Sequence, residues 1–553
     1  MDLKLKLKEL YNDKAESLYQ DILDLIKKEK VDKKSKWLTE KDVMLITYGD
    51  SVIDDNNKPL KVLKTFLNNN LKGYINNVHL LPMFPFTSDD GFSVVDYLKI
   101  NPDLGNWDDI ISLSKNYDLM YDAVMNHISK ESKWFKGFLK GDKKYEDFFI
   151  ECDPKLDYSM VTRPRALPLY YKYDSFEGPK YIWATFSEDQ VDLNYKNPKV
   201  LLEMLKVLIT YAKNGARFIR LDAIGFLWKE LGTTSIHLKE THDLIKIMRY
   251  VIDETYPGTI LISETNVPHL ENISYFGEND DEASLVYQFP LPPLTFFSFL
   301  TGDATKLTNW AKSLKETKLH PKNTYFNFLS SHDGIGMRPT EGILTDDERE
   351  LMVQQVLKSG GAINYKNNPD GTKSPYELNA TFFDAITYGE EKTNIIKKFI
   401  ASQAIMMFLK GMPAIYIHSL LGTRNDIKGM KESGINRRIN RKKLHIDNIN
   451  YFLNDKYSEE SQVFNEYKKL IQLKISDKSF SPDASEEILS LDKRVFSLIR
   501  SHQENDYKAL VLINVSKENV ILNNLNLKMD YQIDNKINLL PYEYKILKIK
   551  KES

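Results

Sequence analysis

The chain has almost no cysteine, since Cys152 is the single one among 553 residues. One cysteine cannot form an internal disulfide, and this composition is typical of a protein kept in a reducing compartment. Long apolar stretches are absent too: none reaches the ~18 residues of a membrane span, and the charged amino terminus lacks the apolar core of a signal peptide. We therefore expect a cytoplasmic protein without a membrane partner.

An excess of charge of one sign is also missing. The chain has 76 Lys and Arg against 78 Asp and Glu, for a net charge of -2. No global field would therefore attract nucleic acid, and an anionic substrate would need local cations. The sequence has neither a Gly-rich nucleotide loop nor a Cys/His cluster, so we expect no cofactor and no metal site.

Short β-rich runs alternate with helical stretches through the middle of the chain. Eight such runs begin at Val43, Asn77, Leu119, Ala216, Thr259, Ser284, Thr324 and Pro413. Eight buried strands alternating with helices predict an α/β fold, a (β/α)₈ TIM barrel whose functional residues lie at the carboxyl ends of the strands.

The pattern also predicts how the chain is divided. Residues 1–40 show helical spacing and form an amino-terminal helical extension, and residues 41–500 hold the catalytic barrel. Insertions at about 135–190 and 335–390 are too long for ordinary barrel connections, and loops of this length on the catalytic face are usually lids or substrate walls. Residues 501–553 alternate apolar and polar residues and predict a small antiparallel β domain.

Three of the β-rich runs end in acids. Arg220 and Asp222 close the fourth run, Glu264 closes the fifth, and His332–Asp333 follow the seventh. Three carboxylates at strand ends of one barrel indicate retaining chemistry on a glycoside, in which one carboxylate attacks the anomeric carbon and another protonates the leaving oxygen. We expect Arg220 to lower the pKa of Asp222, and the apolar residues before Glu264 to raise its pKa.

Four segments resemble the motif regions of the α-amylase family of glycoside-active enzymes. They are DAVMNH (122–127), GARFIRLDA (215–223), Glu264 after an apolar strand, and SSHD (330–333). The resemblance implies that Asp222 is the nucleophile, Glu264 the acid/base and Asp333 the stabiliser of the transition state. It also implies that Arg220, His127 and His332 hold the glucosyl unit in the −1 subsite.

Other segments are similar to the sucrose phosphorylase subgroup of that family. They are LPMFPFTSDDGFSVVDY (81–97), the GIG after His332–Asp333, and GINRRINRKK (434–443). The resemblance implies that Asp89 pairs with Arg437 to seal the −1 pocket beside Phe92. Within the subgroup, VTRPRALPL (161–169), LWKELGTTSIHL (227–238) and MRPTEGIL (337–344) look like glucosylglycerate phosphorylases.

The function implied is reversible phosphorolysis of 2-O-α-D-glucosyl-D-glycerate to α-D-glucose 1-phosphate and D-glycerate. The partners would then be a small-molecule glucoside and inorganic phosphate, and a homodimer is compatible with the sequence. Phosphate and glycerate are both anions and require a cationic wall. Candidates for this wall are Arg163, Arg165 and Arg338, which lie in the two insertions.

Four alternatives stay open at this point. Phosphorolysis of sucrose or sucrose 6-phosphate, or of glucosylglycerol, is the second interpretation, because the choice of acceptor depends on a few loop residues that the sequence does not position. A plain glucosidase would result if phosphate could not displace water. A catalytically silent amylase-fold module would show the loss of one of the three acids, and all three are present.

Overall fold

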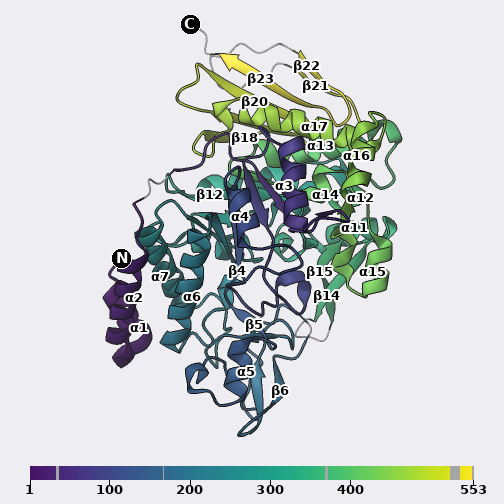
Figure 1. Ribbon diagram of the computed structural model, residues 1–553. Helices are drawn as coiled ribbons and strands as arrows, with labels where there is room; N and C mark the ends of the chain where they lie inside the picture. The colour runs from purple at the N-terminus through teal and green to yellow at the C-terminus, as the bar shows by residue number, and fades with distance from the viewer. Residues whose placement is uncertain (33–35, 166, 368–371, 524–535, 551–553) are drawn as a thin grey trace.

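A computed structural model describes residues 1–32, 36–165, 167–367, 372–523 and 536–550. A barrel occupies its centre, with an antiparallel sheet at one end, an inserted lobe at the other and two helices from the amino terminus along one side (Figure 1). Among the residues described, no helix has both the length and the apolar composition needed to cross a membrane.

The barrel is closed by eight parallel strands, and each of the eight predicted runs supplies one of them. In spatial order the strands are β1 (Met44–Thr47), β3 (Asn77–Leu80), β4 (Asp118–Val124), β9 (Ala216–Asp222), β10 (Ile260–Ser263), β11 (Leu285–Tyr287), β12 (Thr324–Phe328) and β16 (Met412–Tyr416). The predicted α/β barrel is therefore confirmed.

Burial on both faces explains why these strands read as continuous apolar runs. Every residue of β9 is buried, because one face fills the barrel interior and the other is covered by helices. The helix before β9, α6 (Pro198–Lys213), begins with Pro198 behind an Asn197 side chain that accepts a hydrogen bond from a backbone N–H. It packs against α7 (Lys239–Thr255), which leads into β10.

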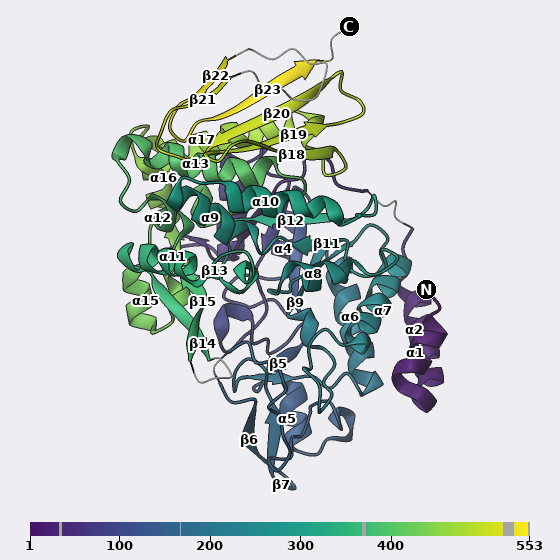
Figure 2. The same cartoon turned by 180° about the vertical axis from the view of Figure 1, so that it is seen from behind.

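The amino terminus forms two amphipathic helices, α1 (Leu3–Tyr11) and α2 (Ala15–Glu29). They lie on the outer surface of α6 and α7 (Figures 1 and 2). Their apolar faces are buried there, with Leu7 and Ile22 fully inaccessible. These helices therefore add a further layer to one side of the barrel.

Two insertions rise from the carboxyl ends of the strands. The first carries α5 (Lys133–Leu139), a hairpin of β6 (Tyr170–Ser175) and β7 (Gly178–Trp183), and the pair β5 (His127–Ser129) and β8 (Gln190–Asp192). The second carries α11 (Asp346–Lys358) and a sheet of β13 (Ile335–Gly336), β15 (Lys373–Asn379) and β14 (Ala362–Asn367). Both border the barrel mouth, so each brings side chains to the same pocket.

The carboxyl-terminal sheet consists of β18 (Ser485–Asp492), β19 (Val495–Ser501), β20 (Tyr507–Asn514) and β23 (Tyr544–Lys550), and β21 (Val520–Asn523) pairs with β22 (Lys536–Leu539). It thus begins before residue 501, where we placed the start of this domain. The physical reason is that neither of its first two strands alternates strictly between apolar and polar residues: β18 is largely half-exposed and β19 is buried at six successive positions.

Candidate active site

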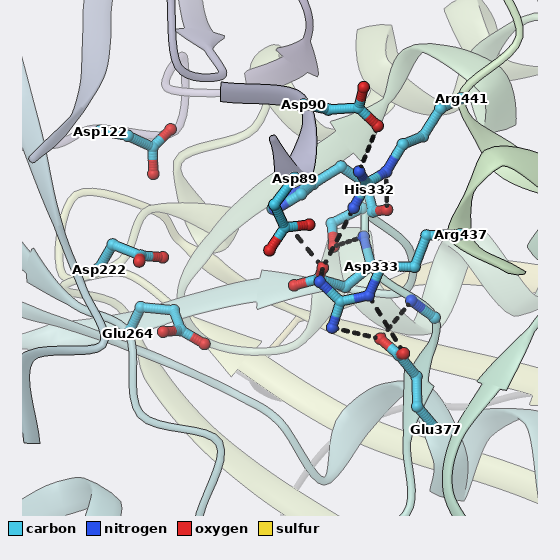
Figure 3. A network of polar contacts seen from close by, with 12 residues as sticks. Asp89, Asp90, Asp122, Asp222, Glu264, His332, Asp333, Glu377, Arg437 and Arg441 are labelled. Atoms are coloured by element: carbon cyan, nitrogen blue, oxygen red, sulfur yellow. Dashed lines mark hydrogen bonds and ion pairs between the residues drawn. The ribbon is translucent and has the colours of Figure 1, made fainter. Parts of the chain in front are cut away.

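The barrel brings the three acids to one pocket. Asp222 is the last residue of β9, Glu264 follows β10 directly, and Asp333 lies in the loop after β12. All three line the pocket at the carboxyl ends of the strands. Asp222 and Glu264 lie beside each other, and Asp333 lies farther along the pocket next to Arg437 (Figure 3).

Arg220 connects the acids at the base of the pocket. Its guanidinium, which is buried, donates to Asp222 at 2.7 Å and also to Asp122, and lies 3.9 Å from Glu264. Asp122 in turn contacts the Nε2 atom of His79 at 2.7 Å. Arg220 and Asp222 are two residues apart on one strand, so both side chains point to the same face. The guanidinium thereby lies between the carboxylates of Asp222 and Asp122 and close to that of Glu264.

Burial controls the protonation of Asp222 and Glu264. It raises the pKa of Asp222 to about 8, and the nearby Glu264 carboxylate acts in the same direction. Burial also raises the pKa of Glu264, as the sequence predicted. Arg220 does act to lower the pKa of Asp222, as expected, but the net shift is upward because the cost of burying a charge exceeds the attraction of the guanidinium.

Two like charges held this close retain one proton between them near neutral pH. Arg220 donates directly to Asp222 but only approaches Glu264. The geometry therefore favours the proton on Glu264 and the negative charge on Asp222. This is the protonation that a nucleophile and a general acid require.

An aromatic and imidazole wall forms another side of the pocket. The rings of Phe92 and His332 stack with centroids 4.7 Å apart. The Nε2 atom of His127 lies 3.0 Å from the carbonyl oxygen of Phe92. Burial lowers the pKa of His127 to about 4 and lowers that of His332 as well. Both imidazoles are neutral at physiological pH, so they can exchange hydrogen bonds with a sugar without adding charge.

The ion pair expected between Asp89 and Arg437 is replaced by three others. Asp89 accepts a hydrogen bond from Arg165 at 2.8 Å. Arg437 pairs instead with Asp333 at 2.6 Å and with Glu377 at 3.0 Å (Figure 3). Arg437 still lies near enough to act on Asp89, whose pKa is lowered by the arginines around it although burial opposes them. The first insertion supplies Arg165 and the second supplies Glu377, whereas Asp333 comes from the loop after β12.

The three loop arginines differ in position. Arg165 and Arg338 line the pocket, one from each insertion. Arg163 is exposed and lies outside the described lining of the pocket. Arg338 approaches Glu271 at 3.9 Å, which is too long for a hydrogen bond. Its guanidinium thus keeps donors available for a ligand.

Several polar residues of the site were not singled out from the sequence. Asp122 is the first residue of the DAVMNH motif, so the motif itself could have identified it. Gln190 and Glu377 line the pocket from the insertions, where no periodic pattern marks them. Asp90 pairs with Arg441, which also donates to the carbonyl oxygen of His332 at 2.8 Å. Asp90 follows Asp89 directly, but nothing in the sequence indicates its partner.

The donor set of the pocket consists of carboxylates, guanidinium groups and imidazoles that are paired with one another. In the part of the chain that the structure describes, no group of three or more His, Cys, Asp or Glu side chains is arranged to hold a metal ion. The pocket therefore offers acid, base and anion-binding groups, which suit transfer of a glycosyl group.

Comparisons with known proteins agree with this chemistry. The alpha amylase catalytic domain family matches residues 72–357. The chain is 47% identical over 480 residues to a glucosylglycerate phosphorylase of Spirochaeta thermophila, covering 87% of this chain and 81% of that protein. A glucosylglycerate phosphorylase of Escherichia coli is 45% identical over 497 residues, covering 90% and 88%.

The fold also has a close counterpart among solved structures. The sucrose 6F-phosphate phosphorylase from Thermoanaerobacter thermosaccharolyticum superposes with a TM-score of 0.75 at 24% identity, covering 90% of this chain and 98% of that one. At this identity the likeness shows the fold alone. The barrel, its insertions and the terminal sheet thus belong to an architecture already seen in experiment.

Proposed function

The chain belongs to the α-amylase family, and from this premise we propose that it is a glucosylglycerate phosphorylase. It converts 2-O-α-D-glucosyl-D-glycerate and inorganic phosphate reversibly to α-D-glucose 1-phosphate and D-glycerate. The reaction is a double displacement with retention of the α configuration. The family assignment made from the four motifs is confirmed, and so is the subgroup suggested by the flanking segments.

In the first step the Asp222 carboxylate attacks the anomeric carbon of the glucosyl unit. Glu264, which holds the proton of the pair, donates it to the glycosidic oxygen as the bond to glycerate breaks. The products are a β-glucosyl ester of Asp222 and free glycerate. Asp333 stabilises the positive charge that develops on the sugar ring, and Phe92, His127, Arg220 and His332 hold the glucosyl unit.

In the second step phosphate enters the position that glycerate has left. A phosphate oxygen attacks the anomeric carbon from the α face and breaks the ester bond to Asp222, while Glu264 recovers a proton from the entering phosphate. Two inversions give α-glucose 1-phosphate. Glycerate and phosphate use one anion site in turn, and we assign Arg165 and Arg338 to it because their guanidinium groups line the pocket from opposite insertions.

One observation carries the proposal above the others. Curated glucosylglycerate phosphorylases match the chain at 45–47% identity over most of its length, whereas matched sucrose phosphorylases reach 27–29%. The catalytic pair and the pocket cations described above are compatible with this activity. Arg163, the third candidate among the loop arginines, is exposed and does not line the pocket, so we do not assign it to the anion site. We retain a homodimer and a cytoplasmic location as parts of the proposal.

The test runs the reaction in the synthetic direction. The protein is incubated with α-glucose 1-phosphate and one acceptor at a time from D-glycerate, glycerol, fructose and fructose 6-phosphate, and released phosphate is measured. We expect the fastest release with D-glycerate. Faster release with fructose or glycerol would assign the chain to a neighbouring specificity, and release of glucose and phosphate without any acceptor would indicate a hydrolase.

A further inference from the structure

The second insertion places one buried carboxylate against the site. Glu377 lies on β15 with 4% of its surface exposed. It accepts hydrogen bonds from the backbone N–H of Gly334 at 2.9 Å and from the side chain of Asn364 at 2.8 Å. It also accepts a hydrogen bond from Nε of Arg437 at 3.2 Å, and its other carboxylate oxygen forms an ion pair with Nη2 of Arg437 at 3.0 Å. One side chain thus joins the inserted sheet, the loop of the third acid and the arginine beside it.

We propose that Glu377 is a positioning residue for Asp333, a role that rests on the function proposed above. It occupies the Nε and Nη2 edge of Arg437 in a two-point contact, as a planar guanidinium fork allows. Only Nη1 then faces Asp333, and it contacts Oδ1 at 2.6 Å. The second oxygen of Asp333 is left for the substrate.

The same strand fixes the backbone on the other side of Asp333. Gly334 lies so close to β15 that a Cβ atom there would meet the carbonyl oxygen of Leu378 at 2.4 Å and the Glu377 side chain at 2.7 Å. Just beyond it, Ile335 and Gly336 pair with β15, and the N–H of Met337 donates to the carbonyl oxygen of Tyr376 at 3.0 Å. The loop that bears Asp333 is therefore attached to the inserted strand along its length.

Charge gives a reason for a second carboxylate at Arg437. If Glu377 were absent, Nε and Nη2 would have no carboxylate partner, and the guanidinium could turn to contact both oxygens of Asp333. Asp333 would then be less available to the glucosyl unit. Figure 3 shows Glu377 and Asp333 approaching Arg437 from different sides. The insertion thereby controls a catalytic acid that it does not itself contain.

The first test replaces Glu377 by Gln. The substitution keeps the size of the side chain but removes the charge. The NH2 group of the new amide would face N–H donors where a carboxylate oxygen now accepts from them. We expect kcat to fall roughly 10²-fold, as a displacement of about 1 Å in a reacting group can cause, with little change in KM for phosphate. The readout includes hydrolysis of α-glucosyl fluoride, a donor that needs the −1 subsite but no particular acceptor.

Glu341→Gln is the matched control. Glu341 lies in the same insertion, forms an ion pair with Lys366 at 2.8 Å and contacts none of the three acids. This control is expected to keep wild-type kcat. Equal kcat for the Glu377→Gln variant and wild type would overturn the proposal, and so would an equal loss in the control. Failure of the wild type on glucosylglycerate, with α-glucosyl fluoride still turned over, would count against the proposed function and leave the Glu377 test valid.

A double substitution separates positioning from general support of the fold. Arg437→Lys removes the guanidinium group with which Glu377 makes its two-point contact. In that background Glu377→Gln should cost much less in kcat than it does in the wild type, because the two residues act through one contact. Full additivity of the two losses would contradict the proposal. If the Glu377→Gln variant does not fold, Asn364→Ala tests the same point, because it removes one hydrogen-bond donor to Glu377. We expect a smaller fall in kcat for this variant. An unchanged kcat would contradict the proposal.

Discussion

Asp222 is the residue on which the proposed chemistry depends most. Asn in its place keeps the shape of the side chain but cannot form the glucosyl ester, so we expect turnover to fall by at least ~10⁴-fold in both directions. Phosphate release from α-glucose 1-phosphate with D-glycerate measures this directly. Asp253→Asn is the control, because Asp253 is a half-exposed partner of Arg249 on an outer helix and should keep full activity. Retention of most activity by Asp222→Asn would refute the assignment of the nucleophile.

The pH dependence follows from the shared proton of Asp222 and Glu264. The active form has one proton on the pair, so activity is lost at low pH when Asp222 also binds a proton. It is lost at high pH when Glu264 gives up the last one. Burial raises the pKa of both groups, that of Asp222 to about 8. Both limbs of the kcat/KM profile should therefore lie at higher pH than ordinary carboxyl groups, which titrate near ~4, would place them.

The same profile measured on Glu264→Gln identifies the basic limb. Because this variant has no proton to lose at position 264, its residual activity should not show the fall at high pH that the wild type shows. A basic limb that persists unchanged in the variant would show that another group titrates there.

Arg338 provides the test of the anion site. Loss of a charge-assisted hydrogen bond costs about 1.5–3 kcal/mol, so Arg338→Gln should raise KM for phosphate and for D-glycerate roughly 10- to 100-fold. The KM for α-glucose 1-phosphate depends on the same site, but hydrolysis of α-glucosyl fluoride does not and should be preserved. Arg163→Gln, in an exposed residue outside the pocket, should change neither constant. Equal effects of the two substitutions would remove Arg338 from the anion site.

The sequence predicted the acids of the site better than their partners. Asp222, Glu264 and Asp333 end apolar strands, and their meeting follows from the barrel geometry alone. The partner of Asp89 did not follow, because Arg165 comes from an insertion whose path has no periodic signal. The sign of the pKa shift at Asp222 also required the structure, since it depends on how completely the carboxylate is buried.

At the scale of elements, the two amino-terminal helices can be tested separately from catalysis. Ile22 of α2 is fully inaccessible where this helix packs on α6 and α7. Ile22→Ala should reduce stability by about 2–5 kcal/mol through lost burial and the cavity it leaves, and so lower the thermal midpoint with kcat unchanged. Leu5 on α1 is 52% exposed, and Leu5→Ala should have little effect on either. A large fall in kcat for the folded Ile22→Ala variant would show that these helices act on the site.

The elements also differ in how far they could be predicted. The eight barrel strands were recognisable because burial on both faces requires continuous apolar residues. In contrast, β14 and β15 are largely half-exposed and contain Asn, Lys and Pro, so their sequences give little sign of a hairpin. It is this hairpin that delivers Glu377. The part of the fold that adapts the barrel to its reaction is thus the part least visible in the sequence.

The whole molecule combines a general scaffold with local charge. Its net charge is only -2, and its pocket gathers Arg165, Arg220, Arg338 and Arg437 around buried carboxylates. The barrel supplies Arg220 and the acids, while the insertions supply Arg165 and Arg338. Under the proposed function, donor chemistry belongs to the barrel and selection of the anionic acceptor to the insertions.

The most direct test of the account follows the glucosyl unit to its final acceptor. The protein is given 2-O-α-D-glucosyl-D-glycerate and phosphate, and the products are identified by NMR. The account predicts α-glucose 1-phosphate and D-glycerate in equal amounts, with no product formed by the Asp222→Asn variant. Free glucose in place of glucose 1-phosphate, or the β anomer of the phosphate, would contradict it.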